Sequence, residues 1–312
     1  MVKYVLKRIG YSIVTLFVLV TLTFFMQRLL PGDPFIGDKN LPEATMQALY
    51  AKYGLDKPLW MQYFMYLGNC LHGDLGISLQ TNRAVTTIIG ESFVVSFDVG
   101  MRAIIFALVL GVLLGTVAAI KRGSPIDTLC MFIALVGVSV PSFIVASVLQ
   151  YFLAFRLTQN VGTAIFATTG WGDFNSKILP VIALGFGSLA QISRLTRTSM
   201  LDVLGQDYIK TARAKGLSQP AIIWKHALRN SIMPVVTVLG PIAASVLTGA
   251  FVVENIFAIP GLGRYFVQSV QNSDYTMISG TTIFYGAFLI LANLVVDLVY
   301  GIIDPRVKLE EG

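Results

Sequence analysis

The feature that most constrains this chain is a series of six apolar segments, each long enough to cross a lipid bilayer as a helix. About 20 apolar residues span the hydrocarbon core, where the backbone must satisfy its own hydrogen bonds. Charged residues make up only 13% of the 312 residues, about half of their share in a soluble domain. The sequence therefore predicts an all-α membrane protein with six transmembrane helices, at residues 9–30, 92–120, 127–155, 178–200, 232–253 and 278–303.

The first apolar segment follows three bases, as a signal peptide would, but it is too long for one and has no small-residue cleavage site. We expect it to be retained. Two short helices are predicted after it, at 42–53 and 58–71, in the one sizeable polar region. The chain is accordingly divided into an N-terminal helix, an external loop region, a five-helix core and a tail, at residues 1–30, 31–91, 92–304 and 305–312.

Lys and Arg gather on alternate sides of the predicted helices. With the N-terminus inside the cell, most bases lie on inner segments, above all between Arg194 and Arg229. Inner loops of membrane proteins carry this excess of positive charge, which also accounts for the net charge of +6 without nucleic acid. We therefore expect a multi-pass protein of the cell membrane with both termini in the cytoplasm.

The most structured of these inner segments is residues 206–234, called here the 206–234 loop. The sequence predicts a helix at 207–215, a left-handed stop at Gly216, and a second helix with Ser218 as N-cap and Pro220 in its first turn. A 3.6-residue period places four apolar side chains on one face of that second helix: Ile223, Trp224, Ala227 and Leu228. The loop is either a solvated connector or a docking element, and residues alone favour the second only slightly.

Several chemistries are excluded by the motifs that are missing. The chain has no GxxxxGK[ST], HExxH, GxSxG or CxxC sequence. His72 and His226 are predicted on opposite sides of the membrane, and Cys70 and Cys130 are isolated, so neither pair forms a metal or redox site. We therefore predict that the chain is not an enzyme, and that it holds no catalytic residue, metal or cofactor.

Three ionisable residues lie within predicted membrane helices, where charge is costly. Asp98 and Arg102 are four residues apart and are expected to pair on one helical face. A structural ion pair is the simpler reading, and a substrate contact is the alternative. Asp297 is deeper in the last helix, and it serves either helix packing or a transport pathway.

Residues 211–230, TARAKGLSQPAIIWKHALRN, resemble the cytoplasmic "EAA" loop of binding-protein-dependent ABC transporter permeases, in the variant of peptide permeases. The first helix followed by LLPGDP, the long external loop and GAFVVENIFAIPGLGRYF (249–266) agree with this family. Lys210–Thr211–Ala212 stands where the general pattern has Glu-Ala-Ala, and Ala227–Leu228–Arg229 replaces its usual ending. Both departures match the peptide branch, and the chain resembles its B-type subunit.

The resemblance implies the type I ABC importer permease fold and an ATP-driven importer of dipeptides or oligopeptides. The implied partners are a C-type permease subunit, two ATPase subunits that carry ATP and Mg²⁺, an external peptide-binding protein and membrane lipid. It also implies that the 206–234 loop docks on an ATPase. The residues concerned are Tyr208, Thr211, Ala212, Arg213, Gly216, Leu217, Ile223, Trp224, His226, Leu228 and Arg229.

By the same resemblance, the segment that follows the fifth helix belongs to an external gate; a re-entrant packing loop is the alternative. Its candidate residues are Glu254, Ile256, Phe257, Pro260, Gly261 and Gly263.

Other functions stay open at this stage. A nickel or glutathione importer of the same branch would have a similar permease. A secondary transporter that works alone would show inverted repeats, and an intramembrane enzyme would need catalytic side chains within the helices; neither signature is found.

Overall fold

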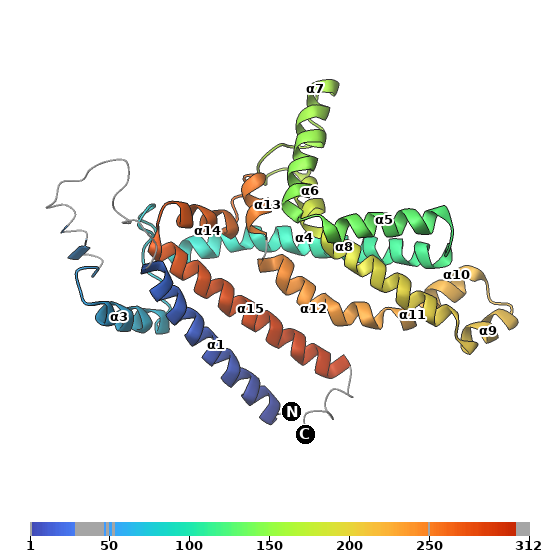
Figure 1. Cartoon of the computed structure of the whole chain (residues 1–312), viewed down its shortest axis with the longest axis horizontal. Helices are drawn as coiled ribbons and strands as arrows, with labels where there is room; N and C mark the ends of the chain where they lie inside the picture. Colours follow the sequence, from blue (N-terminus) through green and yellow to red (C-terminus); the bar gives the residue numbers. More distant parts are fainter. Residues whose placement is uncertain (1, 29–46, 48–49, 52–53, 249, 304–312) are drawn as a thin grey trace. The chain divides into compact units, whose positions relative to one another are not determined.

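A computed structural model describes residues 2–28, 47, 50–51, 54–248 and 250–303. These residues form helices, and the one β-type pairing among them is an isolated antiparallel bridge between Ile77 and Ala84. The predicted all-α class is therefore confirmed. The elements, labelled in Figure 1, are α1 (Val2–Arg28), α3 (Leu59–Leu71), α4 (Val85–Ile120), α5 (Pro125–Ser139), α6 (Ser142–Leu149), η1 (Gln150–Arg156), α7 (Leu157–Val161), α8 (Phe174–Leu204), α9 (Asp207–Ala214), α10 (Gln219–Ala221), η2 (Ile222–Ala227), α11 (Leu228–Ser231), α12 (Met233–Thr248), α13 (Phe251–Ile256), α14 (Leu262–Gln271) and α15 (Tyr275–Ile303).

Five helical stretches among the described residues are long and apolar enough to cross a membrane, and a bent pair makes a sixth if it counts as one span. The pair is α5 with the helix from Ser142 to Val161, and the bend between them is 109°. Figure 1 shows α6, η1 and α7 leaving the line of α5. The segment predicted as one helix at 127–155 is therefore divided by a sharp bend. The bend lies at Val140, which has an extended backbone and is followed by Pro141. A residue before proline is pushed out of the helical conformation.

The described residues fall into two compact units. The first unit lies within residues 1–95 and 261–294, and the second within 96–260 and 295–303. In the first unit, α3 packs on the end of α1: the Phe24 ring lies 5.4 Å from that of Tyr63, whose hydroxyl is 2.7 Å from Thr21 Oγ1. α3 confirms the helix predicted at 58–71, whereas the one predicted at 42–53 lies mostly outside the described residues.

The first unit also holds an anchored loop that the sequence did not indicate. The buried Asp274, just before α15, accepts hydrogen bonds from Ser78 Oγ at 2.6 Å and from the backbone N–H groups of Leu79 and Gln80. One carboxylate thus holds residues 78–80 to the start of α15.

The second unit is built around α8, whose neighbours approach it at glycines. A Cβ added to Gly111 would lie 2.9 Å from Ile192, one added to Gly115 would lie 2.6 Å from Thr196 Cβ, and one added to Gly185 would lie 2.7 Å from Ala103 O. Real Cβ contacts are never that short, so the backbones of α4 and α8 touch. These glycines thus let the two helices pack closely.

Candidate functional site

The first half of the 206–234 loop has the helix and stop that its sequence predicts. α9 begins at Asp207, and the helix is closed by two backbone hydrogen bonds, from Gly216 N to Arg213 O at 2.9 Å and from Leu217 N to Ala212 O at 3.3 Å. Gly216 has a φ of +77°. This is the paired hydrogen-bond pattern of a left-handed C-terminal cap. A Cβ at Gly216 would meet no atom within 4 Å, so the surface beside it is open.

The second half of the loop departs from the predicted face. Residues 222–227 form a π-helical turn, η2, in which hydrogen bonds join residues five apart. Ile222 and Ala227, five apart, are the residues buried on the inner side, and Trp224 is 53% exposed. The 3.6-residue face was therefore wrong at Trp224 and missed Ile222. Ser218 precedes α10 as predicted, but its side chain makes no capping hydrogen bond.

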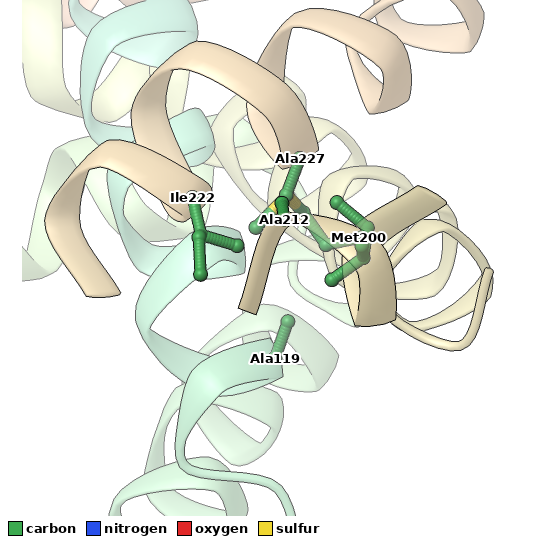
Figure 2. Packing of buried hydrophobic residues seen from close by; sticks show 6 residues of the cluster. Ala119, Met200, Ala212, Ile222 and Ala227 are labelled. Carbon is green, nitrogen blue, oxygen red and sulfur yellow. The ribbon is translucent and has the colours of Figure 1, made fainter. Parts of the chain in front are cut away.

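The loop is seated on the membrane helices by a small apolar core, the loop cluster. Met200 of α8 and Ala119 at the end of α4 meet side chains from α9 and η2 there, as Figure 2 shows. A second tie links the two halves of the loop, since Asn230 Nδ2 donates to Tyr208 Oη at 3.2 Å. The members of the loop cluster are Ala119, Met200, Ile209, Ala212, Ile222 and Ala227.

The outward surface of the loop is basic, with apolar side chains between the charges. Arg213, Lys215, Lys225 and Arg229 are exposed, while the carboxylate of Asp207 is paired with Lys210 at 2.8 Å. Three large apolar or aromatic side chains lie among them: Tyr208 at 44%, Leu217 at 41% and Trp224 at 53% exposure. This surface suits a partner with an acidic rim and an apolar groove.

Most of the other candidate residues of the 206–234 loop are buried or half-buried. Ala212 is buried in the loop cluster, and Ile223 and Leu228 are half-buried against it. His226 is half-buried, and the Thr211 hydroxyl donates to Asp207 O of its own helix at 3.0 Å. The structure thus separates members that hold the loop from members that face outward.

The candidate gate segment is firmly packed within the second unit up to Pro260. Glu254 and Phe257 are buried, and Ile256 is half-buried. The side-chain amide of Gln150 donates to Ile256 O at 2.8 Å and to Thr168 O at 2.9 Å, while Gly170 N donates to Phe257 O at 2.7 Å. Gly261 directly precedes α14, whose second residue is Gly263. Sequence reasoning did not identify Gln150, which carried no motif.

The structure describes the side chains of two of the three ionisable residues predicted within membrane helices, Asp98 and Arg102. Arg102 Nε lies 2.8 Å from Asp98 Oδ1, as the spacing predicted, and Lys177 adds a longer contact at 3.8 Å. Both groups of the pair are partly exposed, and the choice between a structural pair and a substrate contact stays a prediction. Asp297 lies in the part of α15 whose side chains are outside the described residues. No cluster of metal-ligating side chains occurs where the structure describes the chain.

One ion pair was not foreseen. Arg197 binds Asp127 through two contacts of 2.7 and 2.8 Å. These residues are 70 positions apart, so no local spacing could have revealed the pair.

Residues 111–309 match the family model "Binding-protein-dependent transport system inner membrane component", and residues 1–104 match the model of its N-terminal part. The chain belongs to this family. It is therefore a transport component and not an enzyme, and the family associates with ATPase subunits and a binding protein.

Curated relatives match along the whole length. The chain is 44% identical to the dipeptide transport system permease protein DppB of Lactococcus lactis, covering 99% of this chain and 100% of that one. It is 45% identical to DppB of Bacillus subtilis, covering 100% and 99%. The oligopeptide transport system permease protein OppB of Escherichia coli is 41% identical, with 99% and 100% covered.

Two solved structures share the fold. An inward-facing form of the MetNI methionine ABC transporter gives a TM-score of 0.52 at 16% identity, covering 69% of this chain and 95% of that one. An amino acid ABC transporter with histidines gives 0.51 at 15%, covering 69% and 93%. The importer permease fold expected from the sequence is confirmed.

Proposed function

We propose that this chain is the membrane permease subunit of an ATP-driven importer that takes up dipeptides or oligopeptides delivered by an external binding protein. The observation that carries the proposal is full-length similarity, at 41–45% identity, to permeases named for dipeptide and oligopeptide transport. The family supports the same class of transport system. The nickel and glutathione alternative is not better supported.

The proposed complex contains this chain, a C-type permease subunit as its heterodimeric partner, and two ATPase subunits. ATP and Mg²⁺ belong on the ATPases, because this chain lacks a phosphate-binding motif. The excess of Lys and Arg in the 206–234 loop supports a cytoplasmic position for that loop and for both termini.

In this complex the 206–234 loop is the element that receives ATPase motion. Tyr208, Leu217 and Trp224 offer exposed apolar surface, and Arg213 and Arg229 offer charge. The loop cluster supports such a role, because it joins the loop to both α8 and α4. A push on the exposed surface would then move membrane helices instead of deforming the loop.

The segment 254–263 is proposed as part of the external gate. Its support is the family resemblance of the sequence around it, together with the hydrogen bonds that tie Ile256 and Phe257 to Gln150 and Gly170. Those bonds would make the segment move with η1 and with the loop that follows α7.

Co-expression with the C-type subunit and the ATPases tests the proposed function. We expect the purified complex, reconstituted in liposomes with a peptide-loaded binding protein, to accumulate labelled dipeptide when ATP is supplied. Ni²⁺ and glutathione serve as competing cargoes. Isolation of this chain without ATPases, or ATP-dependent accumulation of Ni²⁺ but not of peptide, would refute the proposal.

A further inference from the structure

The Asp127–Arg197 ion pair joins two membrane helices of the second unit. Arg197 Nε contacts Asp127 Oδ1 at 2.7 Å, and Arg197 Nη2 contacts Oδ2 at 2.8 Å. Gly123 N also donates to Oδ2 at 2.9 Å, and Ser124 Oγ accepts from Asp127 N. The Asp127 side chain is only 7% exposed. A planar guanidinium held by both carboxylate oxygens fixes direction as well as distance, so the start of α5 has one defined position along α8.

The pair lies directly beside the attachment of the 206–234 loop. Arg197 precedes Met200 by three residues on α8, which puts the two side chains on adjacent turns of one face. Met200 is fully buried in the loop cluster. A displacement of the loop therefore acts on α8 three residues from Arg197.

Elsewhere, α5 and α4 approach α8 closely at glycines. α5 meets α8 at Gly137, where an added Cβ would lie 2.7 Å from Ala190 Cβ, and α4 meets it at Gly111 and Gly115. Such small residues let helices approach closely, but they offer no charged group that fixes the relative position of the two helices. The bidentate pair is directional and resists sliding.

We infer that Asp127 and Arg197 are positioning residues for energy coupling: they hold α8 in register with α5, so that a push on the 206–234 loop moves both helices together. The inference rests on the proposed function. Without the pair, α8 would slide along α5 and part of the motion would be lost before it reaches the rest of the second unit.

The test uses the whole reconstituted transporter and measures peptide transported per ATP hydrolysed. We expect Asp127→Asn to assemble with its ATPases and to hydrolyse ATP, while the transport ratio falls at least fivefold. Arg197→Lys keeps the charge but cannot hold both oxygens, so we expect a smaller fall in the ratio. Glu91→Gln is the matched control: it removes an ion pair of 2.7 Å that is exposed and in the first unit, and the ratio should stay unchanged.

A wild-type ratio in assembled Asp127→Asn would overturn the inference, as would an equal fall in the control. If Asp127→Asn fails to assemble, Arg197→Lys decides: a lowered ratio supports the inference, and a wild-type ratio means that the pair serves folding alone. The wild-type complex must transport peptide with ATP hydrolysis in the same assay. Its failure to transport peptide would count against the proposed function and not against the pair.

Discussion

Replacing Gly216 with aspartate tests the docking surface of the 206–234 loop, because the structure separates that role from a conformational one. Gly216 has a φ of +77°, a region that Asp and Asn enter more readily than other side chains. A Cβ there would meet no atom of the chain within 4 Å. We therefore expect Gly216→Asp to lower the free energy of unfolding by only about 1–2 kcal/mol.

The cost to docking should be larger. If an ATPase covers this surface closely, the carboxylate would be buried there without a partner, at a cost of about 3 kcal/mol. That corresponds to a roughly 150-fold loss of affinity, since about 1.4 kcal/mol is a factor of ten. The assay compares ATPase retained on the purified permease and uptake of labelled dipeptide, at matched amounts of inserted protein.

Gly162→Asp is the control for this prediction. Gly162 also has an open surface and a left-handed φ of +78°, and it ends α7 instead of α9. The two variants thus share a left-handed φ and the same change of charge. We expect Gly162→Asp to transport peptide normally. Uptake by Gly216→Asp within twofold of wild type, or equal losses in the two variants, would refute the docking role.

Two further predictions concern local stability. Ile222→Ala should destabilise the loop cluster by about 2–5 kcal/mol, because Ile222 is fully buried. Proteolysis within the 206–234 loop should therefore become faster. Ile223→Ala should have the smaller effect on proteolysis, and the reverse order would contradict the π-helical register. Asp274→Ala removes the acceptor of several charge-assisted hydrogen bonds, each worth about 1.5–3 kcal/mol. The rate of amide hydrogen exchange at residues 79–80 should rise much more in Asp274→Ala than in Asp74→Ala, which removes one hydrogen bond to Gly76. Equal protection of these amides in both variants would refute the anchoring role of Asp274.

The sequence by itself determined the class of the protein, its membrane segments and the helix–Gly–helix form of the 206–234 loop. These are local properties. Apolar segment length sets membrane insertion, and Gly216 ends α9 because only a residue tolerant of positive φ completes that cap. The Asp98–Arg102 pair was predictable for the same reason, since four residues make one helical turn.

The tertiary structure decided what depends on residues distant in the sequence or on a change of helical period. Ile222 is buried because η2 has π-helical spacing, which no 3.6-residue count anticipates. The 109° bend at Pro141 depends on what the helices pack against, since proline permits either a kink or a break. The Asp127–Arg197 pair joins the start of α5 to the far half of α8, and only the packing of these helices on each other could select Asp127 as the partner.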